Sequence, residues 1–331
     1  MLDQAAESEQ AKQPNEKQGA VKSNIVILFL EPYVGSGKTV GRCYVLLSSL
    51  IFSLGYFFVR FIPDGAIELG YTRSAISVVL GVIMSKLSQD QLFGSWESYI
   101  MASKRAVIGS LASVAINIAL KCISLSLFTV FGRMKSLLAI YLGVLFLGNQ
   151  FRWLTMLLGV FGIFGVTLVI VPGIYGLDDG SGRSLQISWD FIEIVGLGAT
   201  LAFMVLDVLS AILLIKMANK VSFHEGFTSL QACMALLHSL ILLIEGKPLH
   251  LNWSTTWYYI PCALCFYVGH IFYNEGARLE PNAGIVAVLQ TSIAFFSVMF
   301  DLLFLEVHIS LVNYIGGFIV IGTSLAAIFF K

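Results

Sequence analysis

Long apolar stretches separated by short polar breaks fill the chain from Tyr44 to Phe330. Each stretch is long enough to cross a lipid bilayer, which takes a helix of roughly 20 mostly apolar residues. The breaks hold turn-forming and charged residues, such as Pro63-Asp64-Gly65 and Glu280-Pro281-Asn282. A helix satisfies its own backbone hydrogen bonds in lipid, so we predict an all-α integral membrane protein.

The stretches predict ten transmembrane helices, over residues 44–62, 67–87, 105–123, 127–147, 153–171, 192–218, 226–244, 257–277, 283–305 and 310–330. An even number of spans places both termini on one side of the membrane. The segments on that side carry most of the Lys and Arg residues, which predicts that both termini are cytosolic. The sequence does not say which membrane holds the protein.

The pattern divides the chain into four parts. Residues 1–41 are predicted to form a polar cytosolic tail with a short apolar interfacial segment, and residues 173–189 an outer or lumenal loop. Residues 42–172 and 190–331 each hold five predicted helices. A glycosylation sequon at Asn252 falls on an outer loop, close to the membrane, and the sequence does not decide whether it is modified.

The two five-helix parts look like copies of one unit. Leu145-Phe146-Leu147 corresponds in spacing to Leu303-Phe304-Leu305, and Gly159 corresponds to Gly316. Because five is an odd number, the second copy must enter the membrane in the opposite direction. The fold class is therefore two inverted five-helix repeats, with a site expected between them near the middle of the membrane.

The composition agrees with this class. Hydrophobic residues make up 57% of the chain and charged residues 12%, whereas about one quarter of a soluble domain is charged. The formal net charge is +0, which gives no reason to expect nucleic acid as a partner. Membrane lipid and a small-molecule solute are the expected partners, and a homodimer is possible.

Several of these motifs carry a resemblance to a known family. The first half resembles the EamA repeat of the drug/metabolite transporter superfamily, on Ala119-Leu120, Leu145–Gly148, Gly159, Gly165 and Val171-Pro172. The second half is similar to the solute carrier 35 G-like branch, on Gly276–Pro281, Asp301–Phe304, Glu306 and Gly316-Gly317. One departure is Asn149, where the first repeat of the family often has Glu. The resemblance implies a secondary transporter whose fifth and tenth helices lie at the periphery.

Charged residues inside the predicted helices are the main candidates for a binding site, because charges in lipid usually face a cavity or a partner. Arg133 and Lys135 lie in the predicted fourth helix and could attract an anionic group. Side chains two positions apart on a helix point in directions about 200° apart, so at most one of these two residues should face a cavity squarely. Pairing with an acid such as Asp207, or reaching toward the interface, are the alternatives.

Polar residues on other predicted helices complete the candidate site. Arg73 could line an outer vestibule or fix a helix end, and Asp207 could hold a proton or cation or pair with a base. Ser and Thr can instead bond their own backbone, and Asn and His can bond between helices. The candidates for solute binding are Arg133, Lys135, Arg73, Asn117, Asp207, Gln290, Thr291, Ser292 and His270.

Small residues on the fifth and tenth predicted helices are expected to serve helix packing, at Gly159, Gly162, Gly165, Gly316 and Gly317. No catalytic residues, metal site or cofactor are expected, and the protein is not predicted to be an enzyme. The predicted function is a secondary transporter that moves a small polar, anionic organic solute by alternating access. The alternatives are a non-transporting partner or regulatory protein on the same fold, or a carrier of a nucleotide-sugar-like, cationic or neutral metabolite.

Overall fold

The structure is a computed structural model that describes residues 37–59, 61–62, 65–89, 92–123, 128, 131–175, 191–217, 220–247, 253–305 and 311–329. All of them belong to one compact unit, Ser36–Lys331. The predicted tail up to residue 36, most of the predicted loop 173–189, and Asn252 lie outside the described residues.

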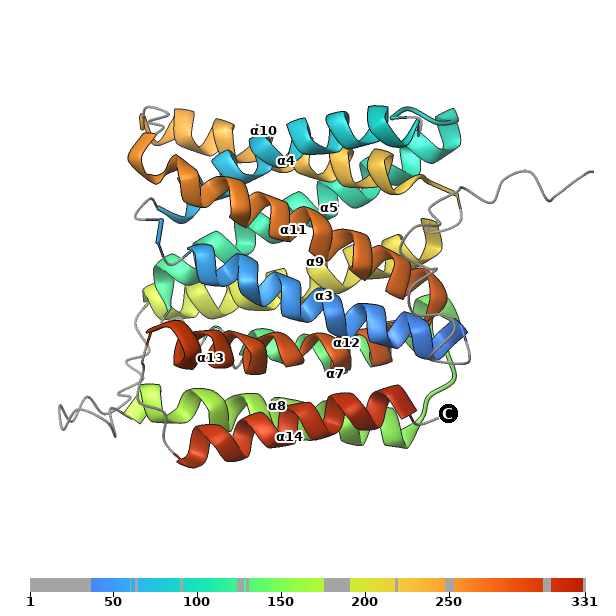
Figure 1. The fold of residues 1–331 in the computed structure, drawn as a ribbon, viewed down its shortest axis with the longest axis vertical. Helices are drawn as coiled ribbons and strands as arrows, with labels where there is room; N and C mark the ends of the chain where they lie inside the picture. The colour runs from blue at the N-terminus through green and yellow to red at the C-terminus, as the bar shows by residue number, and fades with distance from the viewer. Residues whose placement is uncertain are drawn as a thin grey trace, which may run out of the picture. The chain divides into compact units, whose positions relative to one another are not determined.

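The described residues fold into α-helices and contain no strand (Figure 1). The helices are α3 (Gly37–Val59), α4 (Ala66–Ser88), α5 (Trp96–Cys122), α7 (Lys135–Leu147), α8 (Trp153–Tyr175), α9 (Phe191–Met217), α10 (Phe223–Ile244), α11 (Trp253–Leu279), α12 (Ala283–Gln290), α13 (Ser292–Leu305) and α14 (Leu311–Phe329). The prediction of an all-α protein is confirmed over these residues.

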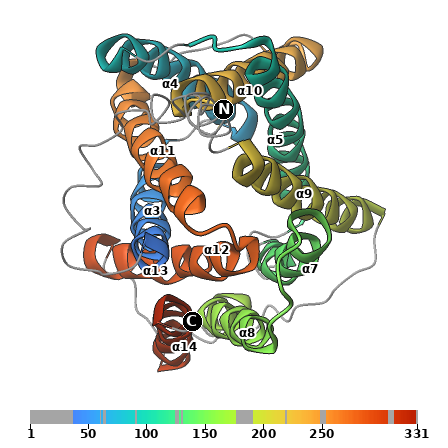
Figure 2. The same ribbon diagram turned by 90° about the vertical axis from the view of Figure 1, so that its right-hand side faces the viewer.

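The helices pack in pairs that join distant parts of the chain. α3 lies against α11, α5 against α9, α4 against α10, and α8 against α14. Figure 2 shows the helices nearly end-on, with α4 and α10 at one side of this unit and α8 and α14 at the other. α7 and α12 lie side by side between these two pairs.

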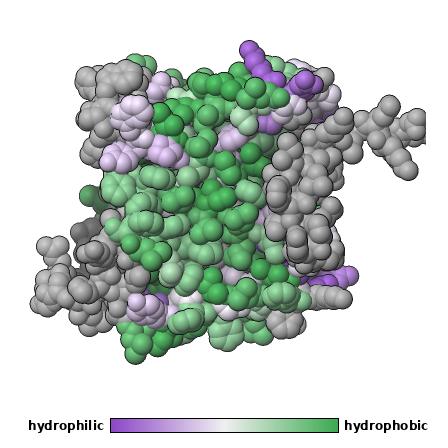
Figure 3. Space-filling model, in the orientation of Figure 1, coloured by the Kyte–Doolittle hydropathy of each residue, from purple (hydrophilic) through white to green (hydrophobic). Residues whose placement is uncertain are grey.

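Among the described residues, seven helices are long and apolar enough to cross a membrane, and Trp153–Val169 is a shorter apolar helix. Their outer faces carry large apolar side chains, such as Leu243 and Phe318, which are 77% and 74% exposed. Figure 3 shows apolar residues over the middle of the helices and hydrophilic residues mainly toward their ends. This surface suits a multi-pass integral membrane protein; the count of ten spans stays a prediction.

One predicted helix start is wrong by more than two turns. α5 begins at Trp96, whereas the predicted helix begins at residue 105. Ser95 caps the helix, because its hydroxyl accepts a hydrogen bond of 3.2 Å from the backbone N–H of Ser98. Arg105 therefore lies inside the helix and not at its end.

Two predicted helices contain a tight turn that the sequence did not reveal. The predicted helix 283–305 is divided at Thr291 into α12 and α13, and Met134 forms a similar turn before α7. At both turns the backbone makes i to i+3 hydrogen bonds, Thr291 N to Val288 O at 3.0 Å and Met134 N to Phe131 O at 3.0 Å. These turns resemble a single turn of 3₁₀ helix, which is common at functional hinges.

The predicted packing glycines lie where helix backbones or side chains approach closely. A Cβ atom at Gly316 would lie 2.6 Å from the carbonyl oxygen of Gly165, and one at Gly165 would lie 2.9 Å from that of Gly316. The nearest atoms to a Cβ at Gly159, Gly162 and Gly317 are side-chain atoms at 3.0, 3.3 and 2.9 Å. α8 and α14 can therefore pack this closely only because neither has a side chain at the contact.

Replacing Gly316 with alanine is expected to destabilise the protein by roughly 1–3 kcal/mol, because the new methyl group would overlap the backbone of α8. Gly322 on the same helix is the matched control, since a Cβ there would have no atom within 4 Å. Gly322→Ala should be neutral or slightly stabilising, because alanine favours a helix by about 1 kcal/mol over glycine. Thermal unfolding in detergent measures both, and equal shifts for the two variants would contradict the contact.

Candidate functional site

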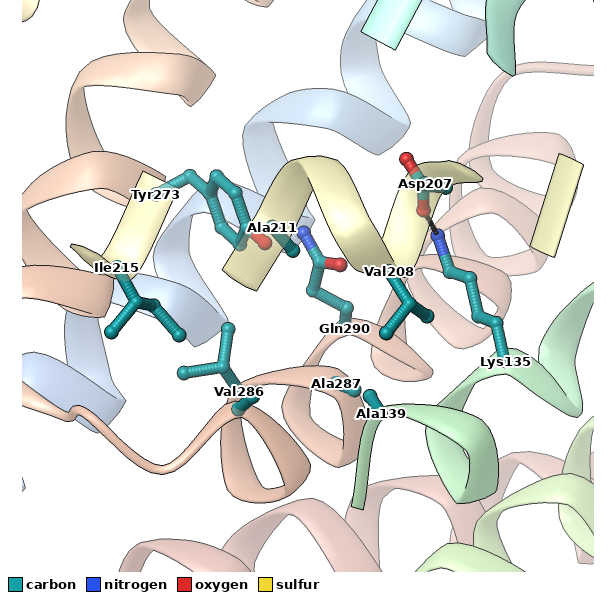
Figure 4. A pocket seen from close by; sticks show the side chains of 11 residues that line it. Lys135, Ala139, Asp207, Val208, Ala211, Ile215, Tyr273, Val286, Ala287 and Gln290 are labelled. Atoms are coloured by element: carbon teal, nitrogen blue, oxygen red, sulfur yellow. Dashed lines mark hydrogen bonds and ion pairs between the residues drawn. The ribbon is translucent and has the colours of Figure 1, made fainter. Parts of the chain in front are cut away.

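A small pocket lies between α7, α9, α11 and α12 (Figure 4). Its polar side chains are Lys135, Asp207, Tyr273 and Gln290, one from each helix. Its volume is about 20 Å³, which is room for about one water molecule. The remaining lining is apolar and consists of Ala139, Val208, Ala211, Ile215, Ala283, Val286 and Ala287.

Lys135 and Asp207 form an ion pair at the edge of this pocket. The Lys135 Nζ atom donates a hydrogen bond of 2.6 Å to Asp207 Oδ2. The two side chains are 18% and 39% exposed, so the pair remains accessible from the pocket. Lys135 Nζ also lies 5.5 Å from the centroid of the Phe203 ring. The structure therefore contains the alternative in which Asp207 pairs with one of the two basic residues.

Arg133 is placed differently from Lys135. Its Nη1 atom lies 3.5 Å from the carbonyl oxygen of Gln290, which is a long and weak contact. Arg133 does not line the pocket, whereas Lys135 does. The geometry agrees with the expectation that at most one of the two residues faces a cavity squarely.

Arg73 and His270 lie away from the pocket lining. The Arg73 guanidinium lies 4.3 Å from the centroid of the Phe266 ring, in a cation–π contact. His270 makes no interhelical hydrogen bond through Nδ1, because this atom is buried without a partner. Its ring instead packs against the rings of Phe52 and Phe227, at 5.0 and 5.4 Å between centroids.

Asn117 joins two helices and does not line the pocket. Its side-chain amide donates a hydrogen bond of 2.8 Å to Nε2 of His238 on α10, and His238 Nδ1 donates one of 2.7 Å to the carbonyl oxygen of Met234. These two bonds define a neutral imidazole with a proton on Nδ1. The expected interhelical hydrogen bond is present at this residue.

Gln290, Thr291 and Ser292 were expected to present polar atoms together at the centre of the protein. Gln290 lines the pocket. The hydroxyls of Thr291 and Ser292 instead donate hydrogen bonds of 2.6 Å to the carbonyl oxygens of Val288 and Leu289. Ser and Thr commonly bond their own helix in this way. Of the three residues, Gln290 alone contributes to the pocket.

Two residues near the pocket were not predicted from the sequence. Tyr273 lines the pocket from α11, and an isolated Tyr in an apolar helix gives no signal of such a role. Arg105 is 4% exposed and interacts electrostatically with Tyr273 and Asp207. The Ser95 cap, combined with the apolar residues that follow Lys104-Arg105, is the signal that could have extended α5 and placed Arg105 inside the membrane.

Parts of the chain are similar to known transporter proteins. Residues 39–171 match the model of the EamA-like transporter family. Human solute carrier family 35 member G1 is 24% identical over 273 residues, which are 80% of this chain and 72% of that protein. A crystal structure of a protein with 15% sequence identity superposes with a TM-score of 0.70 and covers 88% of this chain and 96% of that one. The last comparison concerns the fold alone.

Proposed function

We propose that this chain is a membrane transporter of the EamA-containing drug/metabolite transporter superfamily, which its family match and its relative support. In this proposal it moves a small polar organic anion across the membrane by alternating access. The observation that carries the proposal is the pocket. A basic side chain from the first half of the chain, Lys135, meets polar side chains from the second half, Asp207, Tyr273 and Gln290. A site made by both halves changes shape when the halves move against each other.

The pattern of helix contacts supports two related repeats. If α3, α4, α5, α7 and α8 correspond to α9, α10, α11, α12–α13 and α14, each helix has its counterpart in the other half. Under this correspondence the contact of α3 with α11 is equivalent to that of α9 with α5, and both are present. The contacts α4–α10, α7–α12 and α8–α14 each join a helix to its own counterpart. A two-fold relation between the repeats produces such a pattern.

The size of the pocket supports a conformational cycle. Sites for metabolites usually have volumes of roughly 300–1,000 Å³, whereas this pocket has about 20 Å³. A solute can therefore enter only when the surrounding helices separate. The tight turns at Met134 and Thr291 lie next to Lys135 and Gln290, where such a movement would change the site most directly. Differences in solute affinity between the two states would drive the cycle.

The direction of insertion belongs to the same proposal. Both termini lie in the cytosol, since Lys and Arg residues are more frequent in the segments on that side. A tag fused after Lys331 should bind antibody only after the membrane has been permeabilised. Antibody binding to intact right-side-out vesicles, whose cytosolic face is enclosed, would reverse the assignment.

Neutralising both basic residues is expected to abolish anion uptake. The full-length chain is reconstituted in liposomes and tested with radiolabelled mono- and dicarboxylates, phosphorylated sugars, a nucleotide sugar, and neutral and cationic metabolites. For the anions that the wild type carries, Arg133→Gln combined with Lys135→Gln should reduce uptake to the level of empty liposomes, because no cation near the pocket would remain on α7 or the turn before it.

The control for this experiment is Arg152→Gln, because Arg152 is exposed in the loop before α8. It should transport like the wild type. Unchanged uptake in the double variant would refute the anion-binding role of these residues. Uptake of a cation or a neutral solute by the wild type would assign another substrate class, and no uptake of any solute would favour a non-transporting partner protein.

A further inference from the structure

Arg105 is buried within α5, in a segment that is long and apolar enough to cross a membrane. Its side chain is 4% exposed, and the candidate span is Trp96–Ala119. At 1.5 Å per residue, it lies roughly 13 Å along the helix from Trp96. A charged side chain at this depth normally faces a polar cavity or a partner of opposite charge.

The structure gives Arg105 no such partner. Its Nε atom is buried without a hydrogen bond, and its guanidinium makes no hydrogen bond or ion pair with any residue that the structure describes. Arg42 shows the usual arrangement, since its Nε atom donates a hydrogen bond of 2.6 Å to Glu280. A buried cation without an anion is unfavourable in a folded protein. The described residues therefore leave the Arg105 guanidinium without an anion bonded to it.

The nearby acidic residues bond other side chains and not Arg105. Asp207 interacts electrostatically with Arg105, but its Oδ2 atom accepts the hydrogen bond of Lys135 at 2.6 Å. Glu225 on α10 accepts a hydrogen bond of 3.1 Å from the Ser98 hydroxyl. The remaining close electrostatic neighbours are Tyr273 and His270, and neither side chain supplies a negative charge at neutral pH.

Arg105 also lies among helices with other unsatisfied polar groups. Buried atoms without a hydrogen-bond partner are rare in native proteins. Here such atoms occur on four helices that pack against one another. α10 contacts both α5 and α4, and α11 contacts α4. These atoms include Ser77 Oγ, Ser110 Oγ, Thr228 Oγ1, Gln231 Oε1, His270 Nδ1 and Asn274 Oδ1. Such a concentration indicates an interior that is polar enough to hold water or a polar ligand.

The guanidinium packs beside α10. Gly226 faces Arg105, and a Cβ atom there would lie 3.6 Å from Arg105 Nη1. Tyr273 connects this region with the pocket, because it lines the pocket and interacts electrostatically with Arg105. Arg105 and Lys135 thus both interact with Asp207.

We propose that Arg105, assisted by the Tyr273 hydroxyl, binds the carboxylate or phosphate group of the transported solute. This inference rests on the proposed function and adds a residue and a chemical class to it. A guanidinium presents parallel N–H donors that fit the two oxygens of a carboxylate or phosphate group. The solute supplies the negative charge that the described residues do not bond to Arg105.

The test compares Arg105→Gln and Arg105→Lys with the wild type in proteoliposomes, with radiolabelled succinate and inorganic phosphate as the probes. Arg105→Gln should raise the KM of the transported probe roughly 10- to 100-fold, the usual effect of losing a hydrogen bond to a charged group. Arg105→Lys keeps the positive charge but loses the parallel N–H donors of the guanidinium. Its KM should therefore lie between those of the wild type and Arg105→Gln. Lys104→Gln is the matched control, because Lys104 is the neighbouring basic residue on α5 and is exposed.

The outcomes separate this inference from the proposed function. If the wild type carries neither probe nor any anion of the wider panel, the proposed function fails. If the wild type carries a probe and folded Arg105→Gln has the same KM, only the role of Arg105 is overturned. If Arg105→Gln does not fold, Arg105→Lys and Tyr273→Phe decide, and an unchanged KM in both overturns the inference. A preference for succinate or for phosphate distinguishes the two kinds of anionic group.

Discussion

Replacing Arg42 with methionine is expected to destabilise the protein by about 3–5 kcal/mol, because the change leaves the charge of Glu280 buried without its cation. Both residues are nearly inaccessible, with 6% and 2% exposure. Arg42 Nε donates to Glu280 at 2.6 Å and Arg42 Nη1 donates to the carbonyl oxygen of Ile328 at 3.0 Å. The single arginine thus connects α3 with the turn after α11 and with the end of α14.

The double variant Arg42→Met and Glu280→Met distinguishes the cost of an unpaired charge from the loss of a stabilising pair. Replacing a whole buried ion pair by apolar residues is often neutral, so the double variant should regain most of the stability that Arg42→Met loses. Arg152→Met, at an exposed site, should unfold like the wild type. Thermal unfolding in detergent measures all four proteins. An Arg42→Met protein as stable as the wild type would show that the pair contributes nothing.

The positions of the helices could largely be predicted because the bilayer imposes a length on each apolar stretch. α4 and α9 begin and end within one residue of the predicted ranges 67–87 and 192–218. The prediction failed where a charge lies inside a helix. The predicted helix begins at residue 105, next to Lys104, yet α5 extends back to Trp96. A sequence pattern reports charge and not the tertiary contacts that bury it.

The same reason limits the prediction of the site. Lys135, Asp207 and Gln290 could be identified because polar residues are rare in apolar helices, and all three line the pocket. Tyr273 could not be identified from the sequence, since it lines the pocket only because of how the helices pack. The sequence places Arg42 before the first predicted helix and Glu280 in a polar break. Only the packing of α3 against α11 shows that they are buried together.

Asp207→Asn and Lys135→Gln are expected to shift the apparent affinity for the anionic solute in opposite directions. In the empty pocket, the Asp207 carboxylate occupies Lys135 Nζ at 2.6 Å. An anion that binds Lys135 must compete with this carboxylate. Neutralising Asp207 removes the competitor and should lower the KM, whereas neutralising Lys135 removes the binding group and should raise it. Each shift should be roughly tenfold, as for a hydrogen bond to a charged group.

Shifts of the KM in opposite directions are the informative result, because an ion pair that only stabilises the fold would change the KM of both variants alike. Lys220 and Glu97 form a matched control pair, at 3.4 Å and exposed on the surface. Lys220→Gln and Glu97→Gln should leave the KM unchanged, since an exposed pair contributes little. The KM of each reconstituted variant is obtained from initial uptake rates over a range of solute concentrations. A rise of the KM in both Asp207→Asn and Lys135→Gln would mean that Asp207 binds the solute or supports the site, and does not compete for Lys135.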